Sequence, residues 1–132
     1  MGAMTPTVRA NVKAWECDIM AHMNVQHYLA RSAETVGQLQ ALLGLSPGTG
    51  LRHRAERVLF MRELRNGDSF TIDTGILALA RNGLTTFNEM RNIDTGAIAA
   101  RFIIEFAYTE RANGRELELP AAVRDAAQAL TI

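Results

Sequence analysis

One long helical pattern lies near the start of the chain, and the segments after it are mostly strand-like. Between residues 25 and 43, apolar side chains recur every three or four positions, which predicts a helix. Asn24 is suited to cap its start and Gly44 to end it. Both flanks of the pattern are apolar, so we expect this helix to be buried on most sides. Its apolar positions include Tyr28, Leu29, Ala33, Val36, Leu39, Leu42 and Leu43.

Strand patterns flank this helix, one before it and four after it. The first, over residues 7–17, has an apolar face that ends in Glu16. Short turn sequences separate the later strands, and an Asn-Gly pair at residues 82–83 favours a tight hairpin, so neighbouring strands are expected to be antiparallel. The later strands are predicted at residues 56–64, 69–79, 84–91 and 97–108.

These patterns predict an α+β fold in which one antiparallel sheet wraps around the long helix. Pro120 favours a short final helix over residues 121–130. The 132 residues fit a single domain, which we expect to span residues 7–132. Residues 1–6 are expected to be a disordered N-terminus or a cloning remnant. Such a sheet leaves its outer face and edges partly uncovered, so we expect a homodimer or a homotetramer.

Charge and composition argue against several classes of partner. The chain has 14 Lys and Arg residues against 14 Asp and Glu residues, whereas a nucleic-acid-binding face usually brings a basic excess. No stretch approaches the roughly 18 apolar residues of a membrane span, and the N-terminus lacks a signal-peptide pattern. We therefore expect neither nucleic acid nor membrane as a partner. Cys17 is the single cysteine, so a reducing, cytoplasmic location is expected.

Chemically active side chains gather where the first strand leads into the long helix. Residues 15–28 contain an Asp, two His, an Asn and a Tyr. The first N–H groups of a helix have no partner inside it, and their partial positive charge can stabilise a developing oxyanion. A carboxylate close to that charge stays ionised, as a base or nucleophile must. We therefore expect a catalytic site in this segment.

The same segment resembles the signature of the 4-hydroxybenzoyl-CoA thioesterase group of hot-dog-fold proteins, Asp-x-x-Gly-His-x-Asn-Asn-x-x-Tyr. Asp18, His22, Asn24 and Tyr28 occupy the matching positions. The order of the predicted elements also resembles this family over nearly the whole chain. The resemblance implies a hot-dog fold and hydrolysis of an acyl-CoA thioester, with no cofactor.

The resemblance implies catalytic roles for four residues. The family's Asp, here Asp18, acts on the thioester carbonyl either as a nucleophile or as a base that activates water. Backbone N–H groups at the helix start, here that of Val25, polarise the carbonyl oxygen. His22 is expected to shape the turn or contact the substrate. Asn24 is expected both to cap the start of the helix and to belong to the site.

Substrate binding is expected to involve the helix and several arginines. Tyr28 is expected near the acyl pocket, and Glu34 is a reserve carboxylate because some hot-dog thioesterases use a helical Glu instead of the Asp. The phosphates of CoA require arginines, which in this family come from strand ends and often from the partner subunit. The candidates are Arg57, Arg62 and Arg81, from a larger set with Arg52, Arg54, Arg65 and Arg91.

Two positions depart from the signature. Ala21 stands where the family has Gly, and Val25 stands where it has its second Asn. A side chain at residue 21 would narrow the acyl approach or change the local turn. The missing Asn removes one polar contact. These departures bear on the choice of substrate more than on the chemistry.

Each of these residues also has a purely structural interpretation. Asp18 could cap the turn after the first strand, Asn24 could serve only as the N-cap, and Tyr28 could simply pack in the core. Glu34 could lie at an exposed edge of the helix. Cys17 is expected to be buried and inert, because strand alternation points it away from Asp18.

Two other functions remain open on the sequence. A hot-dog hydratase or dehydratase acting on an enoyl thioester is compatible with the same fold, and so is a non-catalytic acyl-CoA-binding protein. Asp18, His22 and His27 match no metal-binding spacing, so no metal is expected. The chain contains no Gly-x-Ser-x-Gly elbow, which argues against a serine hydrolase.

Overall fold

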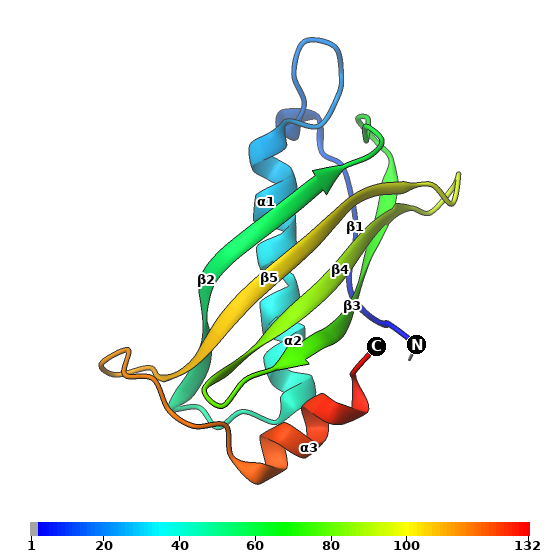
Figure 1. The fold of residues 1–132 in the computed structure, drawn as a ribbon. Helices are drawn as coiled ribbons and strands as arrows, with labels where there is room; N and C mark the ends of the chain where they lie inside the picture. Colours follow the sequence, from blue (N-terminus) through cyan, green and yellow to red (C-terminus); the bar gives the residue numbers. More distant parts are fainter. Residues whose placement is uncertain (1–2) are drawn as a thin grey trace.

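The computed structural model describes residues 3–132 and shows one antiparallel sheet with a helical rod across one face (Figure 1). The five strands follow the order β1-β3-β4-β5-β2, so β1 and β2 form the two edges. This arrangement confirms the predicted α+β architecture. The elements are β1 (Thr5–Asn11), a short 3₁₀ helix η1 (Ala14–Glu16), α1 (Val25–Ala33), α2 (Thr35–Leu43), β2 (Thr49–Phe60), β3 (Ser69–Leu79), β4 (Gly83–Asn92), β5 (Ile98–Glu110) and α3 (Ala121–Ala129).

The core lies between the sheet and the rod. Alternate side chains of β3 and β5 are buried, because successive residues of a strand point to opposite faces. Burial of each large apolar side chain contributes about 1.5–3 kcal/mol to folding. The buried side chains include Phe70, Ile72 and Ile76 of β3, Phe102 and Ile104 of β5, and Leu39 and Leu43 of α2.

The three central strands confirm the sequence patterns closely. β3 has the predicted bounds, and β4 and β5 differ from theirs by one or two residues at each end. In the turns that precede β3 and β5, Gly67 and Gly96 have φ angles of 87° and 75°, which glycine adopts without a steric penalty. The final helix follows Pro120, as expected.

The long helix differs from its prediction in two respects. It is divided at Glu34 into α1 and α2, where the N–H of Glu34 reaches back only three residues to the carbonyl of Arg31. The hydroxyls of Ser32 and Thr35 donate to carbonyls three residues earlier, at 2.8 and 2.7 Å, and such bonds bend helices. The rod is also buried along one face rather than on most sides, since Leu29 is exposed.

The first strand is shorter than predicted. β1 begins at Thr5, two residues before the expected domain start, and ends at Asn11 rather than at residue 17. The chain leaves the sheet because the carboxylate of Glu16 accepts the N–H of Lys13 at 2.8 Å and closes the turn of η1. Met1 and Gly2, part of the expected N-terminal remnant, lie outside the described residues.

The strand predicted at residues 56–64, whose Val-Leu-Phe-Met run at 58–61 favours a buried strand, is wrong in its bounds and in its burial. β2 begins seven residues earlier, at Thr49, and ends at Phe60. It is an edge strand that pairs only with β5, so much of it is exposed in the single chain. Leu59, Phe60 and Met61 are 54%, 50% and 50% exposed. We call these three residues the apolar edge.

Candidate active site

Residues 17–23 form a hairpin loop that projects beyond the end of the sheet, drawn in blue in Figure 1, and Asp18 lies in this loop. A bridge between Cys17 and Met23 closes the loop, which we call the Asp18 loop. Oδ1 of Asp18 accepts the N–H groups of Met20 at 2.9 Å and His22 at 3.2 Å. The side chain therefore does cap its own turn, while Oδ2 takes no part in these bonds and the residue is exposed.

Ala21 adopts the left-handed conformation at the position where the family signature has Gly. Its φ is 63°, and its carbonyl accepts the N–H of Asn66 at 3.0 Å. The Cβ of an L-residue costs about 1–2 kcal/mol in this region. The departure from the signature therefore leaves the turn in the conformation that Gly favours, at a cost in backbone strain.

Replacing Ala21 with Gly is expected to raise the free energy of unfolding by up to about 1 kcal/mol, because relief of strain exceeds the added entropy of the unfolded chain. Urea unfolding measures this change. Ala41→Gly in α2 is the matched control, since the same substitution in regular helix should destabilise by about 1 kcal/mol. A destabilised Ala21→Gly protein would contradict the interpretation of strain at residue 21.

The start of α1 presents a free backbone donor. Asn24 is the N-cap residue, but its side chain makes no capping hydrogen bond, so only part of its predicted structural role is confirmed. Its own N–H donates to the carbonyl of Glu16 at 2.8 Å. Within residues 3–132, no acceptor pairs with the N–H of Val25, which is the donor that the signature position predicts.

A groove of about 290 Å³ opens beside this donor, between the start of α1 and the end of β2. The ring of Tyr28 meets that of Phe60 edge-on, with centroids 5.3 Å apart, and its hydroxyl accepts the N–H of Leu64 at 2.9 Å. Burial raises the pKa of Tyr28, so the hydroxyl stays protonated. Tyr28 thus belongs to both the core and the wall of the groove, which is lined by Met23, Val25, Tyr28, Phe60, Met61, Arg62 and Glu63.

The Asp18 loop is joined to the wall of this groove through His22. The imidazole Nδ1 of His22 contacts the carboxylate Oε2 of Glu63, and His22 also forms a backbone bridge with Arg65. Asp18 itself is not among the residues that line the groove. Glu63 could not be predicted as part of the site, because nothing in the sequence pairs it with a histidine 41 positions earlier.

A buried ion pair underlies the loop. The side chain of Glu16 is 2% exposed. Its carboxylate accepts hydrogen bonds from Nε of Arg31 at 3.1 Å and from Nη2 of Arg31 at 2.8 Å. Burial acts to raise the pKa of Glu16, but the bonds from Arg31 and from the N–H of Lys13 outweigh it, so the pKa lies below its ordinary value of 4.5. Sequence reasoning missed this pair, although Glu16 on the apolar face of a predicted strand was a signal.

Replacing Glu16 with Gln is expected to lower the free energy of unfolding at neutral pH by about 1–3 kcal/mol, because Arg31 is left without its charged partner. Since folding lowers the pKa of Glu16, its contribution is complete above the unfolded-state pKa and lost as the pH falls through the folded-state value. Urea unfolding between pH 3 and pH 7 should show the two proteins converging at the acidic end. A constant difference would contradict this assignment.

A second polar cluster lies farther along α1. The hydroxyl of Ser32 shares its single proton between the carbonyl of Leu29 and Oε2 of Glu56, each at 2.8 Å, and Nε2 of His53 lies 2.9 Å from Oε1 of Glu56. A β-bulge between His53 and Ala55 brings His53 and Glu56 to the same side of β2. These contacts fasten β2 to the helix.

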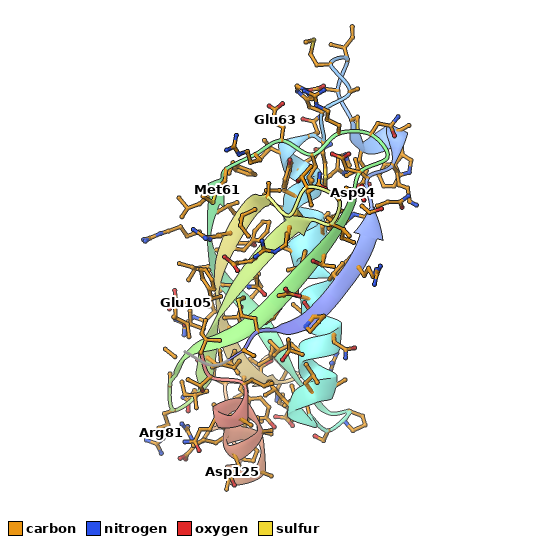
Figure 2. The ribbon with its side chains drawn as sticks, turned by 90° about the vertical axis from the view of Figure 1, so that its right-hand side faces the viewer. Met61, Glu63, Arg81, Asp94, Glu105 and Asp125 are labelled. Atoms are coloured by element: carbon orange, nitrogen blue, oxygen red, sulfur yellow. The ribbon has the colours of Figure 1, made fainter. Side chains whose placement is uncertain are left out.

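The structure separates the predicted substrate-binding residues into two groups. Tyr28 and Arg62 line the groove, whereas Glu34 is half-exposed and pairs with Arg31 at 3.3 Å. Arg57 lies exposed on β2. Arg81 pairs with Glu118 at 3.3 Å in the β3–β4 hairpin, at the end of the molecule opposite Glu63 (Figure 2). Arg81 therefore cannot reach the Asp18 loop of its own chain.

A cavity of about 400 Å³ adjoins the groove on its polar side. Arg62 and Arg65 both line it, and within the described residues neither guanidinium forms an ion pair. Asn92 and Thr95 of the opposite wall add polar groups. Glu63 and Asp68 also line this cavity, so the part of it that suits an anionic ligand is the pair of guanidinium groups.

Metal and thiol chemistry find little support in the described part of the chain. Residues 3–132 contain no group of three His, Cys, Asp or Glu side chains that could hold a metal ion. The thiol of Cys17 is partly buried and donates to the carbonyl of Lys13 at 3.5 Å. Desolvation and the carboxylates of Glu16 and Asp18 raise its pKa, so the thiol stays protonated and poorly nucleophilic. No helix in this part is long and apolar enough to cross a bilayer.

Comparison with known proteins extends these observations. The family described as the thioesterase-like superfamily matches residues 12–127. No curated protein matches the chain in sequence. Among solved structures, 1,4-dihydroxy-2-naphthoyl-CoA thioesterase from Synechocystis aligns with a TM-score of 0.78 at 14% identity, over 93% of this chain and 95% of that one.

Two structures determined with coenzyme A are also similar. A thioesterase from Thermus thermophilus, complexed with coenzyme A and zinc, has a TM-score of 0.80 at 21% identity over 98% of this chain and 96% of that one. The protein SAV2348 from Staphylococcus aureus, in complex with CoA, has a TM-score of 0.83 at 20% identity over 98% and 88%. These likenesses confirm the predicted hot-dog fold.

Proposed function

Because the chain belongs to the thioesterase-like superfamily, and is thereby a thioester hydrolase, we propose that its substrates are acyl-CoA thioesters and that Asp18 is its catalytic carboxylate. The observation that carries this proposal is the N–H of Val25, which has no partner within residues 3–132 and belongs to a residue that lines the groove at the start of α1. A donor in this position suits the oxygen of a thioester carbonyl as it gains charge.

Asp18 supplies the second half of the chemistry. In the base route, its carboxylate takes a proton from water while the water oxygen attacks the thioester carbon. The C–S bond then breaks, and the sulfur of CoA leaves as the thiol after taking up a proton. In the nucleophile route, the carboxylate attacks the thioester carbon and the C–S bond breaks, so that CoA leaves as its thiolate and takes up a proton. Water then hydrolyses the mixed anhydride, which releases the free acid and restores the carboxylate of Asp18. Both routes use the N–H of Val25 in the same way, to hold the developing oxyanion.

The adjoining cavity supports the choice of CoA as the leaving group. Arg62 and Arg65 present two guanidinium groups without carboxylate partners within residues 3–132, beside the opening of the groove. Guanidinium groups bind phosphate oxygens through paired hydrogen bonds. CoA phosphates bound there would leave the thioester directed toward Val25. Arg57 and Arg81 would contribute only from a partner subunit.

A homodimer would complete this site. Asp18 is not among the residues that line the groove, and Phe60 and Met61 of the exposed apolar edge form part of its wall. An exposed edge strand with three consecutive apolar residues is a surface that proteins normally cover. A second copy of the chain placed against β2 would cover this edge and close the groove.

Replacing Leu59 with Glu is expected to convert an assembled wild-type protein to a monomer, because a buried unpaired charge opposes association. Sedimentation equilibrium at micromolar concentration measures the change in mass. Leu77→Glu is the matched control, since Leu77 is also exposed but lies on β3, inside the sheet. A monomeric wild-type protein, or an assembled Leu59→Glu variant, would refute pairing through β2.

The activity itself is tested by thiol release from a panel of acyl-CoAs that differ in chain length and aromatic character. We expect release that follows Michaelis–Menten kinetics with at least one member of the panel. Hydration of an enoyl-CoA, followed by loss of its ultraviolet absorbance, is measured in parallel. Hydration without thiol release would replace the hydrolase assignment with the hydratase alternative, and tight binding without either reaction would indicate a binding protein.

A further inference from the structure

Glu16 connects every part of the segment that holds the proposed site. Its carboxylate binds the guanidinium of Arg31 through two nitrogens and also accepts the N–H of Lys13. Its carbonyl accepts the N–H of Asn24 at 2.8 Å. Asn24 directly precedes the free N–H of Val25, and Asp18 follows Glu16 by two residues. Glu16 thus touches both ends of the Asp18 loop.

Arg31 links this junction to the rest of the fold. Its Nη2 donates to the carbonyl of Asn11 at 3.0 Å, at the end of β1. Its guanidinium lies 5.4 Å from the ring centre of the buried Phe70. Nη1 reaches Glu34 at 3.3 Å, at the break between α1 and α2. One side chain therefore joins the edge strand, the core and the helical rod.

The rest of the Asp18 loop is held on one side, where Ala21, His22 and Met23 pair with residues 63–66. Ile19 at its tip is 100% exposed, and the bonds of Asp18 lie within the loop. The position of Asp18 relative to Val25 therefore depends on these contacts and on the base of the loop, where Glu16 holds Asn24. A misplacement of about 1 Å between a catalytic group and the reacting atoms can cost roughly 10²-fold in rate.

We propose that the buried ion pair between Glu16 and Arg31 is a positioning device, which sets the carboxylate of Asp18 against the oxyanion-binding N–H of Val25. Neither residue touches the substrate. The inference rests on the proposed function, because it assigns a role within that same site. Its consequence is that the pair affects turnover separately from its effect on stability.

The test compares kcat, KM and Tm in wild-type protein and in Glu16→Gln, Arg31→Lys and the double variant Glu16→Gln/Arg31→Met. Arg31→Lys keeps the charge but loses the two-point contact. We expect kcat to fall about 10- to 100-fold in each, by partial misplacement of Asp18, with KM changed less than about threefold. The double variant removes both charges, so Tm should recover while kcat stays low.

Val123→Ala in α3 is the control for simple loss of stability. Val123 is buried far along the chain from the Asp18 loop, and its truncation should lower Tm without changing kcat in the folded fraction. The proposal is overturned if kcat of the ion-pair variants falls no further than kcat of Val123→Ala, or if the double variant recovers kcat together with Tm. An inactive wild-type protein would instead refute the proposed function, which keeps the two failures distinct.

Discussion

Replacement of Asp18 with Asn is expected to lower kcat for thioester hydrolysis about 10²- to 10⁴-fold, the usual contribution of a positioned base. The amide oxygen of Asn can still accept the N–H groups of Met20 and His22, so the turn should persist. The charge is lost, and with it the ability to take a proton or attack the carbonyl. Thiol release at saturating acyl-CoA measures the effect, with Tm as the check on folding.

The control for this variant is Asp125→Asn, which removes an exposed carboxylate from α3 at the far end of the molecule (Figure 2). It should leave both kcat and Tm unchanged. Near-normal turnover by Asp18→Asn would remove Asp18 from the mechanism. Glu63, which lines the groove and contacts His22, would then be the next carboxylate to replace.

Replacement of Val25 with Pro is expected to lower kcat about 10²- to 10³-fold, the usual cost of one lost oxyanion donor. Proline removes the N–H that we assign to the oxyanion, and this N–H has no partner within the described residues that folding would lose. Proline is well tolerated at the first position of a helix. The preceding residue must be extended, and Asn24 already has φ −70° and ψ 143°.

The variant Val25→Ala distinguishes the role of the side chain of residue 25 from the role of its N–H. This variant keeps the donor but shortens the side chain that lines the groove, so KM should change more than kcat. Both variants should unfold near the wild-type temperature, because Val25 is 55% exposed. Equal kcat values for Val25→Pro and Val25→Ala would show that this N–H does not bind the oxyanion.

Local signals explain which parts of this fold were predictable. The hairpin at residues 82–83 rests on an Asn-Gly pair, and the alternation along β3 and β5 follows directly from strand geometry. The proposed site rests on the same kind of local signal, because Asp18, the helix start and Tyr28 lie within eleven consecutive residues. Such features depend on neighbours in the chain.

Contacts between distant residues explain what could not be predicted. The ion pair of Glu16 and Arg31 joins residues 15 positions apart, and it forms only because β1 ends early and η1 turns Glu16 inward. The division of the rod depends on where the hydroxyls of Ser32 and Thr35 find acceptors. The spacing of apolar residues along the chain does not indicate where such hydrogen bonds form.

The first half of β2 is rich in arginine and its end is apolar, and this difference affects how newly made chains avoid misassembly. Arginines at residues 52, 54 and 57 discourage stray strands from pairing with the first half, as charged gatekeeper residues generally do. The second half ends in Val58 and the apolar edge, without a charge until Arg62. An unassembled chain therefore exposes a short apolar stretch that favours pairing with other strands. Its aggregation in a crowded cell depends on how quickly a partner subunit covers that stretch.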